Sequence, residues 1–277
     1  MENIRIIPRL DIKNGLLIKG INFEGLRALG DPDQFAKSYY LNKADEIIYI
    51  DSVATLYGTN NLSKFISNTA KNIFVPLTVG GGIRTNKDIE RTLRYGADKV
   101  SINSAVVKDI KFLKKAVQMF GSSTIACAVE CIKIDKNYFI SISNGRDLQK
   151  VNPFDWIKKL QDNGAGEISI SSINHEGLKG GFDLELYEKV SKIAKVPVLA
   201  HGGAGSFDHV YKLIRNSNIS GVIVSSLFHY DTVNMLKFKK KNIGNFEFLL
   251  NLKKKKFKNN IVLLKKYLKK KKINVRI

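Results

Sequence analysis

The sequence predicts an α/β fold, a closed (β/α)8 barrel built from two (β/α)4 half-barrels. Short runs rich in β-branched residues alternate with amphipathic stretches from beginning to end, which is typical of parallel strands joined by right-handed crossovers. Eight such units follow one another, and a chain of 277 residues has room for one barrel of about 250 residues. The sequence also repeats itself at half its length.

The eight predicted strands cover residues 4–11, 46–51, 74–79, 99–102, 124–130, 167–171, 196–200 and 221–225. The clearest helical patterns between them are 33–41, 86–95, 104–119 and 184–194. The third strand is apolar except for Thr78, as expected of a strand that is buried on both faces.

Two short sequence segments and one serine recur 121 residues later, in the same order. The run ADEI at 44–47 returns as AGEI at 165–168, PLTVGGG at 76–82 returns as PVLAHGG at 197–203, and Ser104 matches Ser225. Solenoid repeats are about 20–50 residues long, so this longer period indicates two half-barrels. We expect residues 1–277 to form one domain, with a Lys-rich insertion near 235–260 before a closing C-terminal segment.

The net charge of +21 is concentrated at the C-terminal end of the chain. Residues 237–277 contain 16 Lys and Arg and one acid, Glu247, so this segment carries +15 and the preceding residues carry +6. Such lysine runs can bind polyanions, but no aromatic platform or groove motif accompanies them. We therefore expect a solvated basic surface and no nucleic-acid partner.

Cysteine content and hydropathy indicate a cytoplasmic protein. The two cysteines, Cys127 and Cys131, lie four residues apart in a predicted strand, about 13 Å at ~3.3 Å per residue, which is too far for a disulfide. No apolar run approaches the ~18–20 residues of a membrane span, and no signal-peptide pattern follows Met1. We expect no membrane association.

Each half-barrel supplies a glycine-rich turn and a pair of small polar residues at its predicted strand ends. Glycines let backbone N–H groups approach an anion, and a following helix N-terminus adds its dipole. We therefore predict two phosphate sites, one in each half of the barrel, for a small substrate with a phosphate at each end. The first predicted phosphate site comprises Gly81, Gly82, Asn103 and Ser104, and the second comprises Gly202, Gly203, Ser225 and Ser226.

Two carboxylates close strands that the repeat places opposite each other. Asp11 and Glu130 are 119 residues apart, and opposed carboxylates suit general acid–base catalysis. Either one alone would more simply cap the next turn. Lys19 follows on the long first loop and is expected to hold a substrate anion or hydroxyl, or else to be a solvated loop lysine. The four histidines lack ligand spacing, so we expect no metal and no cofactor.

Long, ordered blocks of the sequence resemble the cyclase subunit of imidazole glycerol phosphate synthase, the HisF family. They include RIIPRLDIKNGLLIKGINFEGLRALGDP, DEIIYIDSVAT, PLTVGGGI, GADKVSINSA, FGSSTIACAVE, GAGEISISSI and SSLFHY, and the chain ends with KYLKKKKINVRI. The resemblance implies a TIM barrel and a lyase of histidine biosynthesis. It also implies an ammonia channel fed by a HisH-like glutaminase partner. The substrate implied is the bis-phosphate PRFAR, converted to imidazole glycerol phosphate and AICAR.

The resemblance assigns roles residue by residue. Asp11 matches the first catalytic aspartate, Lys19 the substrate-loop lysine and Asp51 an active-site aspartate. The family also has a ring of charges at the amino-terminal mouth of the barrel, through which ammonia enters. This ring is matched by Arg5, Glu46, Lys99 and Glu167. We call these four residues the charged ring. The alternative is that charges at strand starts merely solubilise the base of the barrel.

Several positions depart from the family pattern. Glu130 stands where the family has aspartate, and so does Glu176, which the resemblance places among the substrate-binding residues. Leu178 stands where the family has threonine, and Arg9 and Asn144 also differ from the usual residues. An added methylene displaces a carboxyl group by roughly 1 Å, which can cost about 100-fold in rate.

Three alternatives to the histidine-pathway cyclase therefore stay open. A HisF-like subunit could deliver ammonia for amidination of a nucleotide sugar in surface-polysaccharide biosynthesis. The sister phosphoribosyl isomerase has a similar half-barrel duplication. The non-enzymatic alternative is a barrel scaffold that binds RNA or an acidic membrane surface through its lysines.

Overall fold

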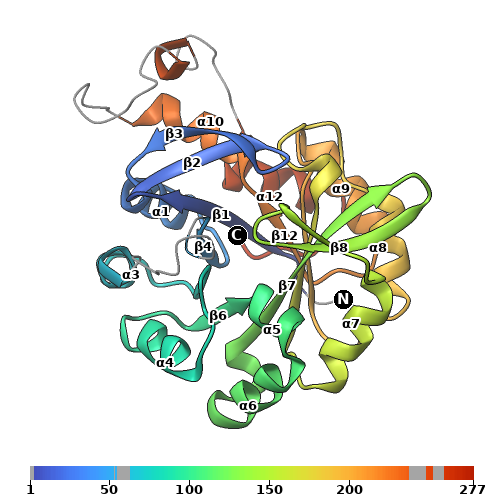
Figure 1. Ribbon diagram of the computed structural model, residues 1–277. Coiled ribbons are helices and arrows are strands. Elements are labelled where there is room, and N and C mark those ends of the chain that lie inside the picture. The colour runs from blue at the N-terminus through green and yellow to red at the C-terminus, as the bar shows by residue number, and fades with distance from the viewer. Residues whose placement is uncertain (1–2, 53, 55–62, 237–247, 252–258) are drawn as a thin grey trace.

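Eight parallel strands form a closed barrel in the computed structural model, which describes residues 3–52, 54, 63–236, 248–251 and 259–277 (Figure 1). The barrel strands are β1 (Arg5–Lys13), β4 (Ile47–Asp51), β5 (Leu77–Gly80), β6 (Lys99–Ile102), β7 (Ile125–Ile134), β10 (Glu167–Ser172), β11 (Val198–His201) and β12 (Gly221–Val224). Each pairs with its neighbours in sequence order, and the β12–β1 pairing closes the circle. The predicted α/β TIM barrel is confirmed.

Helices surround the barrel on its outside (Figure 1). They are α1 (Pro32–Leu41), α3 (Ser63–Ala70), α4 (Asn86–Arg94), α5 (Ser104–Lys108), α6 (Ile110–Phe120), α7 (Pro153–Asp162), α8 (Leu184–Ser191), α9 (Phe207–Asn216), α10 (Ser226–Met235) and α12 (Ile261–Lys270). The helix predicted over 104–119 is divided at Asp109. That residue has an extended backbone, and its side chain caps α6 by accepting from Lys111 N at 2.9 Å.

Two antiparallel hairpins, absent from the sequence-based prediction, extend the carboxyl ends of β1 and β7. The first consists of β2 (Leu16–Ile21) and β3 (Glu24–Gly30), and the second of β8 (Asn137–Ile142) and β9 (Asp147–Gln149). β1 and β7 are the first and fifth strands of the barrel, so the hairpins occupy equivalent places in the two halves. The words that repeat at 121 residues likewise flank the second and sixth strands and the third and seventh strands.

An apolar layer crosses the middle of the barrel interior. Ile7, Ile48, Leu199 and Ile223 form this cluster, with Ile50 packed against it. Side chains alternate along a strand, so Arg5 lies on one side of this layer and Arg9 on the other, both on the inward face of β1. The layer separates the polar groups at the two ends of the barrel. A larger apolar cluster fills the space between barrel and helices.

The closing segment packs on the amino-terminal end of the barrel. Leu268, Ile273 and Val275 are buried, and Ile4 N donates to Asn274 O at 2.9 Å. The Nζ of Lys265, on α12, donates to the Lys43 carbonyl at 2.6 Å and to Asp45 at 2.7 Å. The lysine runs 239–241 and 253–256 lie outside the described residues.

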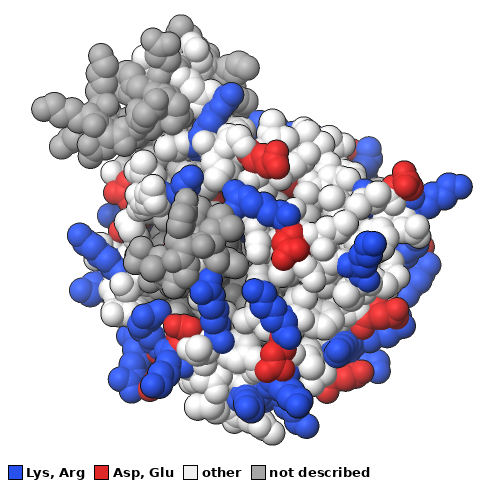
Figure 2. Space-filling model, viewed as in Figure 1, with Lys and Arg blue, Asp and Glu red and all other residues white. Residues whose placement is uncertain are grey.

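Basic side chains are spread over the face seen in Figure 2 rather than gathered into one patch, and acidic side chains lie among several of them. Both cysteines are buried and free. Among the described residues, no helix is long and apolar enough to cross a membrane.

Candidate functional site

The carboxyl ends of β4, β5, β6 and β7, with the segments that follow them, line a cavity of about 490 Å³. Six of the predicted site residues line it, together with Arg9: Asp51, Gly81, Gly82, Asn103, Ser104 and Glu130. The first predicted phosphate site therefore opens into the cavity, with Glu130 on its wall. Gly81 has φ +92, and a Cβ there would lie 2.3 Å from the Asp51 carbonyl oxygen, so only glycine lets the two strand ends approach this closely.

Asp11 is buried at the inward face of β1 and is paired with Arg9. Arg9 donates from Nε at 2.9 Å and from Nη2 at 2.8 Å, both to Oδ1 of Asp11. Asp11 is not part of the cavity lining, whereas Arg9 is. The two predicted catalytic carboxylates thus differ in their surroundings. Asp11 is held by a cation, and Glu130 faces the cavity.

Burial raises the pKa of Glu130 to about 7. The Gly145 N–H, which donates to its Oε2 at 2.8 Å, the charge of Arg9 and the side chain of Asn103 oppose this rise, and the charge of Asp11 adds to it. Gly145 lies between β8 and β9, so the second hairpin holds the carboxyl group in place. A carboxyl that titrates near neutral pH can both give and take a proton during a reaction.

The second predicted phosphate site is a small, shallow pocket. Gly202, Gly203, Ser225 and Ser226 line a pocket of only about 10 Å³, together with Glu176 and His201. Gly203 has φ +115, and a Cβ there would lie 2.0 Å from the Gly181 carbonyl oxygen. The loop between β10 and α8 therefore packs directly on this turn. The two predicted phosphate sites are equivalent in sequence, but the first lines a cavity of about 490 Å³ and the second a pocket of about 10 Å³.

Lys19 and Glu176 form a buried ion pair over the second predicted phosphate site. Glu176 also accepts from Phe23 N at 3.2 Å, and its carbonyl accepts from Asn22 N at 2.9 Å. These contacts tie the β2–β3 hairpin to the loop after β10. Lys19 is thus a buried, paired lysine, and its expected contact with a substrate stays a prediction.

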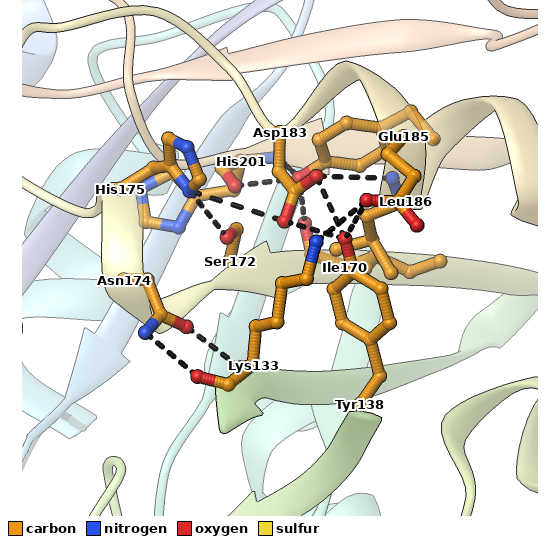
Figure 3. A network of polar contacts seen from close by, with 11 residues as sticks. Lys133, Tyr138, Ile170, Ser172, Asn174, His175, Asp183, Glu185, Leu186 and His201 are labelled. Atoms are coloured by element: carbon orange, nitrogen blue, oxygen red, sulfur yellow. Dashed lines mark hydrogen bonds and ion pairs between the residues drawn. The ribbon is translucent and has the colours of Figure 1, made fainter. Parts of the chain in front are cut away.

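A polar network holds the loop after β10 against the second hairpin (Figure 3). Tyr138 donates to Asp183 at 3.0 Å, and Asp183 caps α8 by accepting from Leu186 N at 3.0 Å. Asn174 accepts from Lys133 N at 2.7 Å, and the Lys133 ammonium reaches Glu185 on α8 at 2.6 Å. The network immobilises the segment that carries Glu176.

The charged ring lies at the opposite end of the barrel. Arg5 donates to Glu46 at 3.0 Å and also to Glu167, and Lys99 lies 2.9 Å from Glu46 and 2.8 Å from Glu167. Both carboxylates are buried, and Thr78 donates to Glu46 at 2.6 Å. Four alternating charges thus form a closed circle of ion pairs across the barrel floor.

Arg9 and His201 are polar residues of the site to which the sequence analysis gave no role. His201 is buried, and its Nδ1 lies 2.9 Å from the Ser171 hydroxyl. Burial, with the charges of Arg9 and Lys19, lowers its pKa well below the ordinary value, so it is neutral at pH 7. The period of two along β1 could have identified Arg9, since it shares the inward face of Asp11.

Comparisons with known proteins agree on one family. The family model described as "Histidine biosynthesis protein" matches residues 5–234. The imidazole glycerol phosphate synthase subunit HisF of Legionella pneumophila is 45% identical over 209 residues, which are 75% of this chain and 99% of that protein. Subunits with the same name from Natranaerobius thermophilus and Bacillus cereus are 38% and 39% identical; each alignment covers 94% of the relative and 85% or 86% of this chain.

Proposed function

Because the chain belongs to the HisF family, the imidazole glycerol phosphate synthase subunits of histidine biosynthesis, we propose that it is the lyase that uses ammonia to convert PRFAR to imidazole glycerol phosphate and AICAR. The observation that carries this proposal is the pair of buried carboxylates, Asp11 and Glu130, on the first and fifth barrel strands beside a 490 Å³ cavity. Active sites of such barrels lie at this end of the strands.

The first predicted phosphate site gives the substrate its orientation. Backbone N–H groups of Gly81 and Gly82 and the polar groups of Asn103 and Ser104 take one phosphate, and Ser104 stands at the N-terminus of α5. Glu130 lines the same cavity, and its pKa of about 7 lets it take up and release a proton near neutral pH. It is the group that exchanges protons with the substrate, and Asp11 is its partner on the opposite strand.

Ammonia enters through the charged ring from a HisH-like glutaminase docked at the amino-terminal face. The ring and the active cavity lie at opposite ends of the barrel, separated by the apolar layer at Ile7 and Ile48. An apolar passage favours neutral ammonia over ammonium, because a bare charge is expensive to desolvate. Two buried, free cysteines suit the reducing cytoplasm, where we place the protein.

Amidination of a nucleotide sugar is a second candidate, because Glu130 and Glu176 are each longer than the family's aspartate at these positions. Glu176 lines the second predicted phosphate site and pairs with Lys19. The longer carboxylates alter the site on both sides of the barrel, which favours a substrate other than PRFAR.

One assay separates the two candidates. The purified chain is incubated with ammonium at high pH, where free ammonia is abundant, and with either PRFAR or a nucleotide-activated N-acyl sugar. Our proposal predicts release of AICAR and imidazole glycerol phosphate from PRFAR. Amidination of the sugar without release of AICAR would replace it with the second candidate.

A further inference from the structure

Arg9 presents an unused hydrogen-bonding edge to the cavity. Its Nε and Nη2 both bond to Oδ1 of Asp11, and among the described residues Nη1 has no hydrogen-bond partner. Arg9 is 7% exposed and lines the cavity. A guanidinium on a cavity wall whose Nη1 donors are free can bind an oxygen atom of a ligand held in that cavity.

The guanidinium of Arg9 is fixed from several sides. Asp11 holds one edge through a geometry that only an arginine fork offers, and the ring of Phe23 lies 5.4 Å from the guanidinium carbon. The backbone carbonyl of Arg9 accepts from the Ser225 hydroxyl at 3.1 Å. A donor that is held in place before the reaction stabilises a developing charge without the cost of reorienting.

Glu130 stands on the same cavity wall and acts electrostatically on Arg9. The other charged or titratable groups around this end of the barrel fall into two sets. Asp11, Lys19, Asp51, Glu176, His201 and His229 come from β1, β2, β4, the loop after β10, β11 and α10, and the cavity lining also includes Arg84, Lys108, Asp109 and Lys115. Burial lowers the pKa of His201 and of His229, the latter to about 3, so neither is a cation at neutral pH. Lys19 is already paired with Glu176.

We propose that Arg9 is a catalytic residue of the reaction proposed above, and that its Nη1 edge binds the oxygen of the substrate carbonyl that ammonia attacks. The ammonia nitrogen forms a bond to the carbonyl carbon, and the electron pair of the C=O π bond moves to oxygen. Arg9 stabilises the resulting oxyanion. Glu130 then protonates this oxygen, and its carboxylate takes the surplus proton from nitrogen, which leaves a neutral carbinolamine.

This inference rests on the proposed function only in requiring ammonia and a carbonyl group. PRFAR and an N-acyl sugar both offer such a carbonyl, so the role of Arg9 is the same for both substrates. It also explains why Asp11 is turned to Arg9 and not to the cavity. Asp11 fixes one edge of the fork and so aims the other.

The decisive variant is Arg9→Lys, which keeps the positive charge and can keep the ion pair with Asp11. Its donors share one nitrogen, so it has no second donor atom fixed at the position of Nη1. Removal of one oxyanion donor costs about 10²–10³ in kcat. We expect a kcat loss of that size with ammonium as nitrogen source, and a KM within a few-fold of the wild-type value. Arg94→Lys, on the exposed face of α4, is the matched control and should be silent. A kcat within a factor of about three of the wild type in Arg9→Lys would overturn the proposal.

A second measurement needs no substrate and therefore separates this inference from the proposed function. The titration of Glu130 is followed by carboxyl ¹³C NMR in the free protein. The charge of Arg9 lowers the pKa of Glu130 from the value that burial alone would give, so Arg9→Met should move the titration above about 7, and Arg9→Lys should leave it close to wild type. An unchanged titration in a folded Arg9→Met protein would show that the guanidinium does not act at the cavity, and the inference would fall even if PRFAR is turned over. If the wild type turns over only the N-acyl sugar, the proposed function fails and the kcat comparison is made on that substrate.

Discussion

Lys19 and Glu176 form an ion pair in which the two side chains are 2% and 1% exposed. The pair joins β2 of the first hairpin to the loop after β10, two segments that are 157 residues apart in the sequence. A charge left alone at such a site has neither water nor partner, so loss of one member costs far more than the pair contributes.

We therefore expect Glu176→Gln to lower the free energy of unfolding by roughly 3–5 kcal/mol. The double variant Lys19→Met/Glu176→Met should recover most of that loss, because no charge is then left unpaired. Urea unfolding of the three proteins measures both effects. The exposed pair Lys192–Glu188 is the control, and Glu188→Gln should change stability by less than about 0.5 kcal/mol. Equal small losses at the two pairs would show that Lys19 is solvated in solution.

The pKa of Glu130 makes stability depend on pH in a defined direction. Its value is raised from 4.5 to about 7 by burial, so the folded state binds the proton more tightly than the unfolded chain does. This contribution is fully present below about pH 4.5 and is lost as the pH rises through about 7.

Glu130→Gln, which resembles the protonated group at every pH, should be more stable than the wild type above pH 7, by roughly 3 kcal/mol at most. Near pH 4 the difference between the two proteins should vanish. The measurement is the free energy of unfolding of both proteins at a series of pH values between about 4 and 9. A constant difference over that range would show that Glu130 does not titrate as described.

The charged ring should matter for delivered ammonia and not for the chemistry. We expect Lys99→Ala or Glu167→Ala to change glutamine-dependent turnover in the complex with a glutaminase more than turnover with free ammonium. The reason is that the ring lies at the far end of the barrel from Glu130, beyond the apolar layer. Arg94→Ala, on the exposed face of α4, should affect neither assay. Equal losses in the two assays with the ring variants would assign the ring a structural role.

Lys265 should be important for stability although it belongs to the basic C-terminal segment. It is 1% exposed and bonds to Asp45 and to the Lys43 carbonyl. We expect Lys265→Met to destabilise the protein by about 3 kcal/mol, because it leaves a buried carboxylate with a weaker partner. The neighbouring Lys266 is exposed, and Lys266→Met should be nearly neutral in the same thermal or urea unfolding experiment. Similar effects of the two substitutions would contradict the packing of α12.

The barrel could be predicted from sequence because each buried parallel strand leaves an apolar run and each strand end leaves a polar residue. All eight strands lie where these runs predicted them, although β5 begins at Leu77 and not at residue 74. The two hairpins were not predicted as separate strands. The alternation of apolar and polar residues in them continues the alternation in β1 and β7, so the sequence shows no break between a barrel strand and its hairpin. Their tight turns, such as the one at Asn14 and Gly15 with φ 50 and 74, are local signals that the larger barrel pattern concealed.

For the candidate site, the sequence predicted which strand ends carry polar groups and glycine turns, but not how these groups are arranged in space. Period-two alternation predicts that Asp11 and Glu130 point inward, and the glycine words identify both turns. The β10–α8 loop folds back so that Gly181 packs on Gly203, whereas in the described part of the chain no such loop covers Gly81, which opens to the cavity. Such a contact between distant segments leaves no pattern in the local sequence. The pairing of Arg9 with Asp11 is a similar case, since either residue alone could have faced the solvent.

In the proposed reaction, Glu130 exchanges protons with the substrate at the carboxyl end of the barrel, and Asp11 acts on the same step through Arg9. The most direct test of these roles is the ammonium-dependent turnover of PRFAR by Asp11→Asn and Glu130→Gln, with substrate affinity measured by calorimetry on the same samples. We predict that kcat falls by about 10²–10⁴ in Glu130→Gln, which loses the acid–base group, and by about 10²–10³ in Asp11→Asn, which releases the Arg9 donor. Affinity should be retained, because neither substitution touches the proposed phosphate contacts at Gly81, Gly82, Asn103 and Ser104. Retention of more than about a tenth of the wild-type kcat in either variant would contradict these roles.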